Sequence, residues 1–212
     1  MRPLRQVSTT CNEERNIGRS LESVKGVADE VVVVDSFSTD RTEVIVREHG
    51  ARFIQHAFDG HIEQKNRAIT QATHPFILSL DADEALDDRL RASILAARSG
   101  SADGFTMNRL TNYCGSWIRH GGWYPDRKLR LWDSRKGRWA GTNPHDRYEM
   151  DADARIEHLE VDLLHYSYYS VADHEKQVEY FTTIAAKALA AQGKRASALK
   201  LWLSPIAKFI GC

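Results

Sequence analysis

The sequence has few cysteines and no excess of charge of either sign. Its 212 residues include three cysteines, and 29 Lys and Arg residues balance 29 Asp and Glu residues, so the formal net charge is zero. Cys11, Cys114 and Cys212 are widely spaced, which predicts neither a disulfide framework nor a zinc site and favours a reducing compartment. Zero net charge argues against general nucleic-acid binding, because that binding depends on neutralising phosphates.

Long apolar runs and glycine-rich nucleotide loops are also missing. Residues 1–5 lack the apolar core of a signal peptide, and no stretch approaches the roughly 20 apolar residues of a spanning helix. We therefore expect a cytoplasmic protein. The absence of a G-x-x-x-x-G-K loop and of a G-x-G-x-x-G fingerprint argues against P-loop and dinucleotide enzymes. Hydrophobic residues make up 42% of the chain, enough for the core of one domain.

Strands and helices are predicted to alternate in the first half of the chain. β-prone or apolar segments predict strands at residues 6–11, 31–34, 53–56 and 76–80. Helical spacing of apolar residues predicts helices up to about residue 25 and at residues 42–49, 61–72 and 86–98. We expect Asn12 to cap the first of these helices. This alternation predicts an α/β fold with a doubly wound, mostly parallel sheet flanked by helices.

The second half of the chain has a different pattern. Strands are predicted at residues 105–113, 128–132, 138–140 and 162–166, interrupted by an aromatic, glycine-rich loop at residues 121–125. A long helix is expected over residues 171–192, ended by Gly193.

Three carboxylates follow the predicted strand that begins at Phe76. Asp81, Asp83 and Glu84 stand at its carboxyl end, where open α/β sheets place their ligands. On an extended backbone Asp81 and Asp83 point to the same side, so they would face one Mg²⁺ or Mn²⁺ ion that holds a diphosphate. The alternative is a solvated acidic turn before the next helix.

Other polar residues follow the neighbouring predicted strands. Asn12 and Glu13 follow the first strand and Asp35 the second, and Lys65 lies on a helix near the same edge. These groups are expected to line one crevice, in which Lys65 would neutralise phosphate charge. The alternatives are a helix cap for Asp35 and an ordinary solvated lysine for Lys65.

These residues lie in motifs that resemble those of family 2 glycosyltransferases. The resembling segments are residues 11–17, 31–35 with 38–42, 64–66 and 81–84. Residues 121–126, 130–132 and 144–146 are similar to the bacterial lipopolysaccharide core subgroup that adds glucose to the inner core. The resemblance covers about residues 7 to 175, and it implies a GT-A fold, a nucleoside diphosphate-sugar donor (a UDP-sugar) and a divalent cation.

The resemblance also implies roles for individual residues on the donor side. The segment Cys11-Asn12-Glu13 together with Asp35 would contact uracil and ribose, and Lys65 would contact the diphosphate. Asp81 would contact the ribose or the metal, and Asp83 would be a direct ligand of Mg²⁺ or Mn²⁺. His165 lies where some GT-A enzymes supply a histidine to the metal or diphosphate, although an ordinary strand histidine is an equal alternative.

Two carboxylates are candidates for the base of an inverting transfer. Asp146 matches a position where relatives usually carry Glu after His, and Asp126 precedes a strand much as the base does in other family 2 enzymes. We favour Asp146; the alternatives are a surface acid for Asp146 and a turn cap for Asp126. Trp117, Trp123 and Tyr124 are candidates for stacking on the acceptor sugar, or else for the core.

Both ends of the chain differ from the pattern of the resembling family. Only Val7 is strongly apolar in the first predicted strand, so we expect a shortened amino terminus and a weakened uracil pocket. Residues 181–212 carry five basic and no acidic residues together with many apolar ones. This tail is expected to lie on an anionic membrane surface or to pack on its own domain.

The predicted organisation is therefore a glycosyltransferase domain and a tail. Residues 1–170 would form the GT-A domain, with a nucleotide-sugar half at 1–100 and an acceptor half at 101–170, and residues 171–212 a helical tail. The expected location is cytoplasmic or peripheral on the inner membrane. The alternatives are a non-catalytic nucleotide-sugar-binding remnant and a sugar-phosphate nucleotidyltransferase, although the latter would need a basic glycine-rich loop where residues 12–14 stand.

Overall fold

The computed structural model describes residues 1–142, 145–194 and 197–210. Pro144 of the predicted acceptor-side motif, Arg195 of the basic tail and Cys212 lie outside the described residues.

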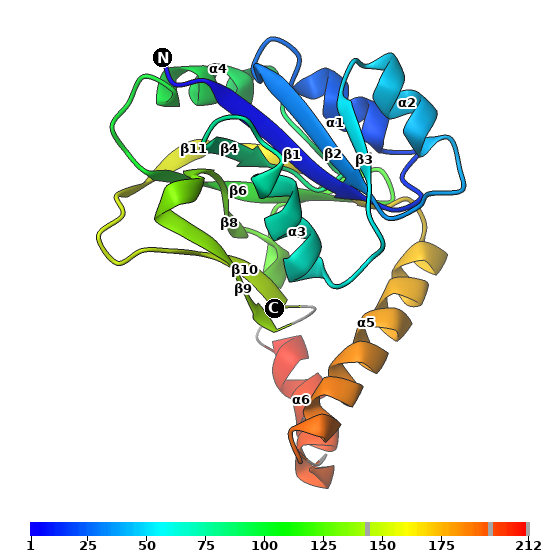
Figure 1. The fold of residues 1–212 in the computed structure, drawn as a ribbon. Coiled ribbons are helices and arrows are strands. Elements are labelled where there is room, and N and C mark those ends of the chain that lie inside the picture. Colours follow the sequence, from blue (N-terminus) through cyan, green and yellow to red (C-terminus); the bar gives the residue numbers. More distant parts are fainter. Residues whose placement is uncertain (143–144, 195–196, 211–212) are drawn as a thin grey trace.

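A mixed sheet forms the centre of the molecule (Figure 1). Its strands are β1 (Leu4–Thr10), β2 (Glu30–Asp35), β3 (Arg52–Gln55), β4 (Phe76–Ser79), β5 (Glu84–Ala85), β6 (Gly104–Tyr113), β7 (Ser116–Ile118), β8 (Arg127–Asp133) and β11 (Ile156–Tyr168). The order is β3-β2-β1-β4-β8-β6-β11-β5, with β7 paired to β6. Strands β3, β2, β1 and β4 run parallel, as do β6 and β11, whereas β8 runs antiparallel between β4 and β6. The predicted doubly wound, mostly parallel sheet is confirmed.

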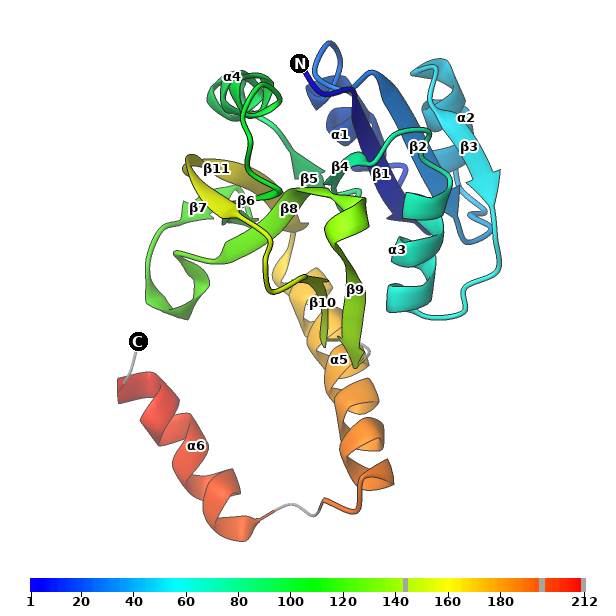
Figure 2. The same ribbon diagram turned by 60° about the vertical axis from the view of Figure 1, so that its left-hand side comes forward.

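Helices cover both faces of this sheet (Figure 2). On one face lie α1 (Ile17–Ser23), α2 (Thr42–Glu48) and α4 (Asp88–Ala97), whose buried apolar residues pack on alternate residues of the strands. On the other face α3 (His61–Thr70) packs on Val7, Val32, Val34 and Ile77. The valines of β2 are packed against helices on both faces of the sheet, so polar and apolar residues do not alternate along this strand.

The first strand occupies a central position rather than a weak edge. β1 pairs along its length with β2 and also with β4. Two of its buried polar residues have internal partners: Gln6 Nε2 donates to Ser8 Oγ at 2.6 Å, and Ser8 Oγ donates to the carbonyl of Leu80 at 2.7 Å. Hydrogen bonds therefore allow polar side chains of β1 to be buried, although the strand contains few apolar residues.

The predicted helix cap at Asn12 is wrong. Helix α1 begins at Ile17, and Asn12 has a φ of 56°, in the left-handed region. Its side-chain oxygen instead accepts from the backbone N–H of Thr39 at 2.8 Å. The residues after β1 therefore form a loop that is tied to the loop after β2, and the helix begins only after this loop.

A β-hairpin that the sequence did not fully indicate covers part of the α3 face. It consists of β9 (Gly137–Thr142) and β10 (His145–Met150), of which β10 was not predicted. Tyr148 of this hairpin stacks on Trp132 with 4.0 Å between ring centroids. Gly137 faces Met150 so closely that a Cβ would overlap the carbonyl oxygen of Glu149. Strand β7 was also not predicted, and β11 is longer than the predicted residues 162–166.

The chain ends in two helices that stand apart from the body of the molecule (Figures 1 and 2). Helix α5 (Val171–Ala191) begins where Ser170 Oγ accepts from the N–H of Asp173 at 3.2 Å, and it contains no buried residue. Helix α6 (Ala198–Ile210) continues through Pro205. Within the described parts of the chain, no helix combines the length and hydrophobicity needed to span a bilayer.

Candidate active site

The carboxyl ends of β1, β2 and β4 bring the predicted donor-side residues to one edge of the sheet. The loop after β1 carries Asn12 and Glu13, β2 ends in Asp35, and the turn after β4 carries Asp81 and Asp83. Lys65 reaches this edge from α3, and its Nζ atom lies 3.3 Å from Asp81 Oδ1. The structure therefore brings these strand ends to one edge, where Lys65 and Asp81 form an ion pair.

Asp81 and Asp83 contact different partners in this structure, and the sharing of one cation between them stays a prediction. The chain turns immediately after β4, where Glu84 N–H donates to the carbonyl of Asp81 at 3.0 Å, so the alternation of an extended strand does not apply. Asp81 Oδ2 lies 2.5 Å from Arg130 Nη2. Asp83 Oδ2 instead lies 3.1 Å from His165 Nε2.

Arg130 and Glu84 form a buried ion pair beneath Asp81. Arg130 Nη2 contacts Glu84 Oε1 at 2.6 Å, and the two side chains are 5% and 0% exposed. Burial opposes the charge on Asp81, but the pKa of its carboxyl is held below the usual range by Arg130 and Lys65. Sequence reasoning assigned no role to Arg130 or Glu84. The available signal was an arginine between two leucines in a strand that is otherwise buried.

Lys65 joins Asp81 to the favoured base candidate. Lys65 Nζ lies 2.8 Å from Asp146 Oδ2 and 4.4 Å from the ring centroid of Trp139. Burial acts to lower the pKa of Lys65, yet the charges of Asp81 and Asp146 raise it. The lysine is therefore fully charged and has two carboxylate partners.

The residues on either side of Lys65 tie α3 to two other parts of the site. Gln64 Nε2 donates to Ser36 Oγ at 2.9 Å, in the loop after β2. Asn66 exchanges two hydrogen bonds of 3.1 Å with the backbone of Trp139 in β9. The segment Gln64-Lys65-Asn66 thus links the donor-side loop to the hairpin that carries Asp146.

The second base candidate lies in a separate ion-pair group. Asp126 Oδ2 accepts from Arg109 Nε at 3.0 Å, and its Oδ1 lies 2.9 Å from Lys128 Nζ. Burial favours the protonated acid, but the hydrogen bond from Lys128 and the charge of Arg109 outweigh it and lower the pKa of Asp126. A carboxylate stabilised by two cations is a weaker proton acceptor.

The other donor-side residues differ in their exposure. Asp35 is fully buried and accepts from Thr10 Oγ1 at 3.0 Å and from the N–H of Ser38 at 2.8 Å. It shapes the loop after β2 but does not cap α2, whose N-cap residue is Arg41, and its buried carboxylate presents no surface to a ligand in this structure. Cys11 and Asn12 are exposed on the neighbouring loop.

Glu13 lies close enough to the acidic turn to feel its charge. Burial raises the pKa of Glu13 to about 7; a hydrogen bond from Asn16 opposes this rise, and the charges of Asp83 and Asp81 add to it. Repulsion among these carboxylates is a feature that a bound cation would relieve.

The site contains a partial donor set for a divalent cation. No cluster of three or more His, Cys, Asp or Glu side chains arranged for a metal occurs among residues 1–142, 145–194 and 197–210. Asp83 and His165 nevertheless present an oxygen and a nitrogen side by side, and the carboxylate side chain is 25% exposed. Mg²⁺ is commonly held by one or two carboxylates and completed by substrate phosphates and water. The residues present fit a cation that arrives with a diphosphate.

The predicted acceptor aromatics occupy two neighbouring clusters. Trp117 packs edge-on against Tyr166 at 5.3 Å, and the N–H of Tyr166 donates to the carbonyl of Asp83. Trp123, 37% exposed, contacts Tyr113, Tyr168 and His174. Tyr124 Oη donates to Asp162 Oδ1 at 2.9 Å. These side chains pack against other residues of the protein and are also partly exposed to solvent. The structure therefore decides neither for stacking on an acceptor sugar nor for a place in the core.

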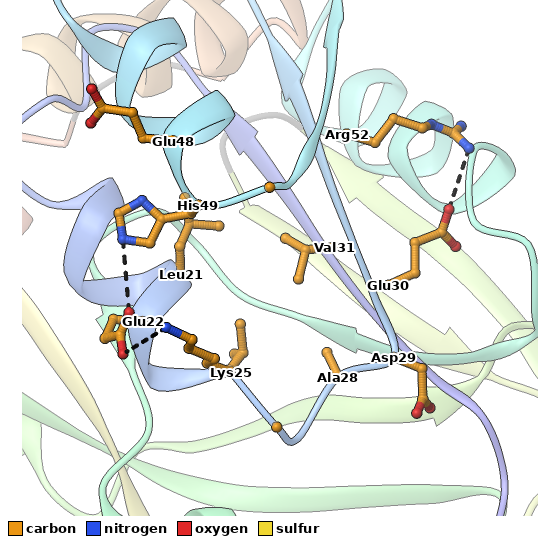
Figure 3. A pocket seen from close by; sticks show the side chains of 13 residues that line it. Leu21, Glu22, Lys25, Ala28, Asp29, Glu30, Val31, Glu48, His49 and Arg52 are labelled. Atoms are coloured by element: carbon orange, nitrogen blue, oxygen red, sulfur yellow. Dashed lines mark hydrogen bonds and ion pairs between the residues drawn. The ribbon is translucent and has the colours of Figure 1, made fainter.

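A pocket of about 550 Å³ opens at the opposite edge of the sheet, where α1 and α2 end and β2 and β3 begin (Figure 3). Glu22 lies near both Lys25 and His49 there, and Arg52 pairs with Glu30 at 3.3 Å. Its lining includes none of the predicted site residues among those the structure describes.

Comparison with known proteins gives matches along most of the chain. The family model described as Glycosyl transferase family 2 matches residues 7–157. An uncharacterized glycosyltransferase of Rickettsia typhi is 30% identical over 212 aligned positions, which cover 93% of this chain and 73% of that protein. The lipopolysaccharide core biosynthesis glycosyltransferase LpsC of Rhizobium meliloti is 34% identical over 149 positions, which cover 65% of this chain and 53% of LpsC.

A solved structure shares the architecture. The crystal structure of S. aureus TarS 1-349 superimposes with a TM-score of 0.57 at 18% identity, covering 78% of this chain and 60% of that one. The chain therefore spans less than two thirds of that fragment and about half of LpsC. The likeness to TarS establishes the fold, which is the GT-A arrangement.

Proposed function

The chain belongs to glycosyltransferase family 2, and we propose that it transfers a sugar from a nucleoside diphosphate-sugar to a lipopolysaccharide inner-core or related glycan acceptor, with inversion and with a divalent metal. Glucose is the sugar in this proposal. The observation that carries it is the contact of Asp81, Lys65 and Asp146 at the carboxyl edge of the sheet. A donor-side acid, a cation for phosphate and a candidate base lie there in one group.

The donor is proposed to bind along the loops of residues 1–100. The exposed Cys11 and Asn12 and the partly buried Glu13 would contact the base and ribose of a UDP-sugar. Asp35 would act by fixing the loop at Ser38, since its own carboxylate is buried. Lys65 would contact the diphosphate, and Asp81 would contact the ribose or orient Lys65.

Asp83 and His165 are the residues proposed to hold Mg²⁺ or Mn²⁺. A bound cation would offset the charge of the departing nucleoside diphosphate. Thr111 Oγ1 lies 3.2 Å from His165 Nδ1 and orients the ring so that Nε2 faces Asp83. Such support from a neighbouring group is common for histidine ligands.

Asp146 is proposed as the base of the transfer. The acceptor hydroxyl loses its proton to this carboxylate as its oxygen attacks the anomeric carbon from the face opposite the diphosphate. Asp126 remains the second candidate, but its two cationic partners and lowered pKa favour Asp146.

The acceptor is proposed to bind over residues 101–170, near Trp117, Trp123 and Tyr124. Aromatic faces and edges suit the apolar faces of sugar rings. The similarity to LpsC supports a lipopolysaccharide core acceptor.

The helical tail of residues 171–212 is proposed to rest on the cytoplasmic face of an anionic membrane. Leu199, Trp202, Ile206 and Phe209 of α6 are 68%, 80%, 57% and 87% exposed, so α6 does not bury these side chains against its own domain. In the sequence, residues 181–212 carry basic residues and no acidic ones beside these apolar side chains. Basic amphipathic helices of this kind bind at lipid interfaces.

A panel of nucleoside diphosphate-sugars, incubated with Mn²⁺ and a truncated lipopolysaccharide core, tests the proposal through release of the nucleoside diphosphate. UDP-glucose is expected to be used best, with attachment to the glycan confirmed by mass spectrometry. Binding of UDP without transfer to any acceptor would indicate a non-catalytic nucleotide-sugar-binding remnant. Release of pyrophosphate from a sugar phosphate and a nucleoside triphosphate would indicate a nucleotidyltransferase.

A further inference from the structure

Lys65 is shared between two carboxylates that belong to different halves of the proposed reaction. Its Nζ atom lies 2.8 Å from Asp146 and 3.3 Å from Asp81, and the side chains of Lys65 and Asp146 are each 13% exposed. Trp139 lies against the ammonium group at 4.4 Å from its ring centroid. In this arrangement one oxygen of the candidate base is engaged in an ion pair, which makes the carboxylate a weaker proton acceptor.

Two cations stand beside Asp81, and they differ in their freedom to change partners. Arg130 is 5% exposed and is held by both Asp81 and Glu84. Lys65 carries a compact ammonium group on a flexible stem, and it reaches the edge of the sheet from α3. A diphosphate that enters at the carboxyl edge would compete with Asp146 for this ammonium group, because both are oxygen anions.

We propose that Lys65 exchanges partners during the reaction: it holds Asp146 in the free enzyme and turns to the diphosphate when the donor binds, which releases Asp146. This inference rests on the proposed function, since the competing ligand is the donor's diphosphate. Donor binding and release of the base are then coupled, and the coupling is reciprocal. The enzyme therefore acquires a free base only after the donor is in place.

The chemistry that follows release balances in one step. The acceptor oxygen forms its bond to the anomeric carbon while its proton passes to the freed Asp146. The bond from the anomeric carbon to the phosphate oxygen breaks, and its electron pair leaves with the nucleoside diphosphate, whose charge Lys65 now contacts.

Isothermal titration with UDP in Mn²⁺ buffer tests the exchange without relying on activity. Asp146→Asn removes the competitor for Lys65, so we expect UDP to bind about fivefold or more tightly than to the unaltered protein. Lys65→Met is expected to weaken UDP binding. In the Lys65→Met background, Asp146→Asn is expected to have no further effect, because the interaction acts through Lys65. The matched control is Asp153→Asn, which breaks a 2.9 Å pair with Lys136 away from the site and should leave UDP affinity unchanged.

Three results would overturn the proposal. Equal or weaker UDP binding by Asp146→Asn would show that Asp146 does not compete with the diphosphate. Tighter binding that persists in the Lys65→Met background would show long-range repulsion rather than partner exchange. In both cases UDP binding by the unaltered protein leaves the proposed donor intact. Failure of that protein to bind UDP would instead reject the donor, and the exchange with it.

Discussion

Arg130 Nη2 lies 2.6 Å from Glu84 Oε1, and both side chains are shielded from solvent. The same nitrogen reaches Asp81, so one guanidinium group contacts two carboxylates at the proposed donor site. The cation is supplied by β8, the antiparallel strand inserted between β4 and β6. Removing it would leave the buried Glu84 without its nearest cation and Asp81 with Lys65 as its remaining cationic partner.

Arg130→Met is therefore expected to lower the free energy of unfolding by about 3–5 kcal/mol, the usual effect of removing one partner of a buried ion pair. Urea denaturation followed by circular dichroism measures it. Arg135→Met is the control, because Arg135 also pairs with a carboxylate at 2.6 Å but is 73% exposed; no measurable loss is expected there. Equal stability of both variants would show that the Arg130 pair has no structural role.

Asp83→Ala is expected to abolish transfer and the stabilisation of the protein by Mn²⁺. A ligand that binds the folded state raises the unfolding temperature, so differential scanning fluorimetry with and without Mn²⁺ reports the site directly. Treatment with EDTA should stop transfer by the unaltered protein, and added Mn²⁺ should restore it. Asp88→Ala, at an exposed position on α4, is the control. Metal-dependent transfer by Asp83→Ala would reject Asp83 as a ligand.

Glu13→Gln is expected to change the pH dependence of stability in metal-free protein. Since the pKa of Glu13 is raised from 4.5 to about 7 in the folded protein, the folded state holds its proton more tightly than the unfolded state. The contribution of Glu13 to the free energy of unfolding is fully present below the pKa that it has in the unfolded chain. This contribution is lost as the pH rises through the pKa that it has in the folded protein. The variant should thus gain in unfolding temperature over the unaltered protein at about pH 8 and lose that advantage near pH 4.5. A constant difference across this range would contradict the raised pKa.

Asn66→Ala is expected to slow transfer by displacing Asp146. Asn66 makes two hydrogen bonds to the backbone of Trp139, on the strand paired with that of Asp146. Their loss should cost about 1–3 kcal/mol in stability and about tenfold in kcat, because small displacements of a catalytic group have large effects. Thr70→Ala, on the exposed side of the same helix, is the control. Unchanged kcat in Asn66→Ala would show that the hairpin is positioned by other contacts.

Trp202→Glu is expected to weaken binding to vesicles that contain anionic lipid, measured by co-sedimentation. The change removes an exposed apolar side chain and adds a negative charge to α6. Val44→Glu is a matched control, since Val44 is an exposed apolar residue on α2. Binding that is unchanged after deletion of residues 197–212 would reject the membrane role of α6.

The parts of the fold that were predicted depend on local patterns. The valine run of β2, the acids that follow β4 and the helical spacing in α2 and α3 each carry their information within about ten residues. They were sufficient to predict the sheet and to predict that polar strand ends meet at its carboxyl edge. Helix α5 was also predicted, and its observed bounds lie within a few residues of the expected ones.

The parts that were not predicted depend on contacts between distant residues. Arg130 meets Glu84 across 46 positions, and Lys65 meets Asp146 across 81. β10 has little alternation of its own and is stabilised by pairing with β9 and by packing of Tyr148 on Trp132. Asp81 and Asp83 have different partners because the chain turns at the end of β4, a turn that residue spacing alone did not reveal.

The helix that carries the tail away from the domain has a defined length. α5 has 21 residues and so measures about 32 Å, and it follows directly after the strand that contains His165. With α6 resting on a bilayer, α5 would act as a spacer that sets the height of the catalytic edge above the lipid. An acceptor would then be selected by reach as well as by chemistry, because a sugar attached close to the lipid would remain below the site.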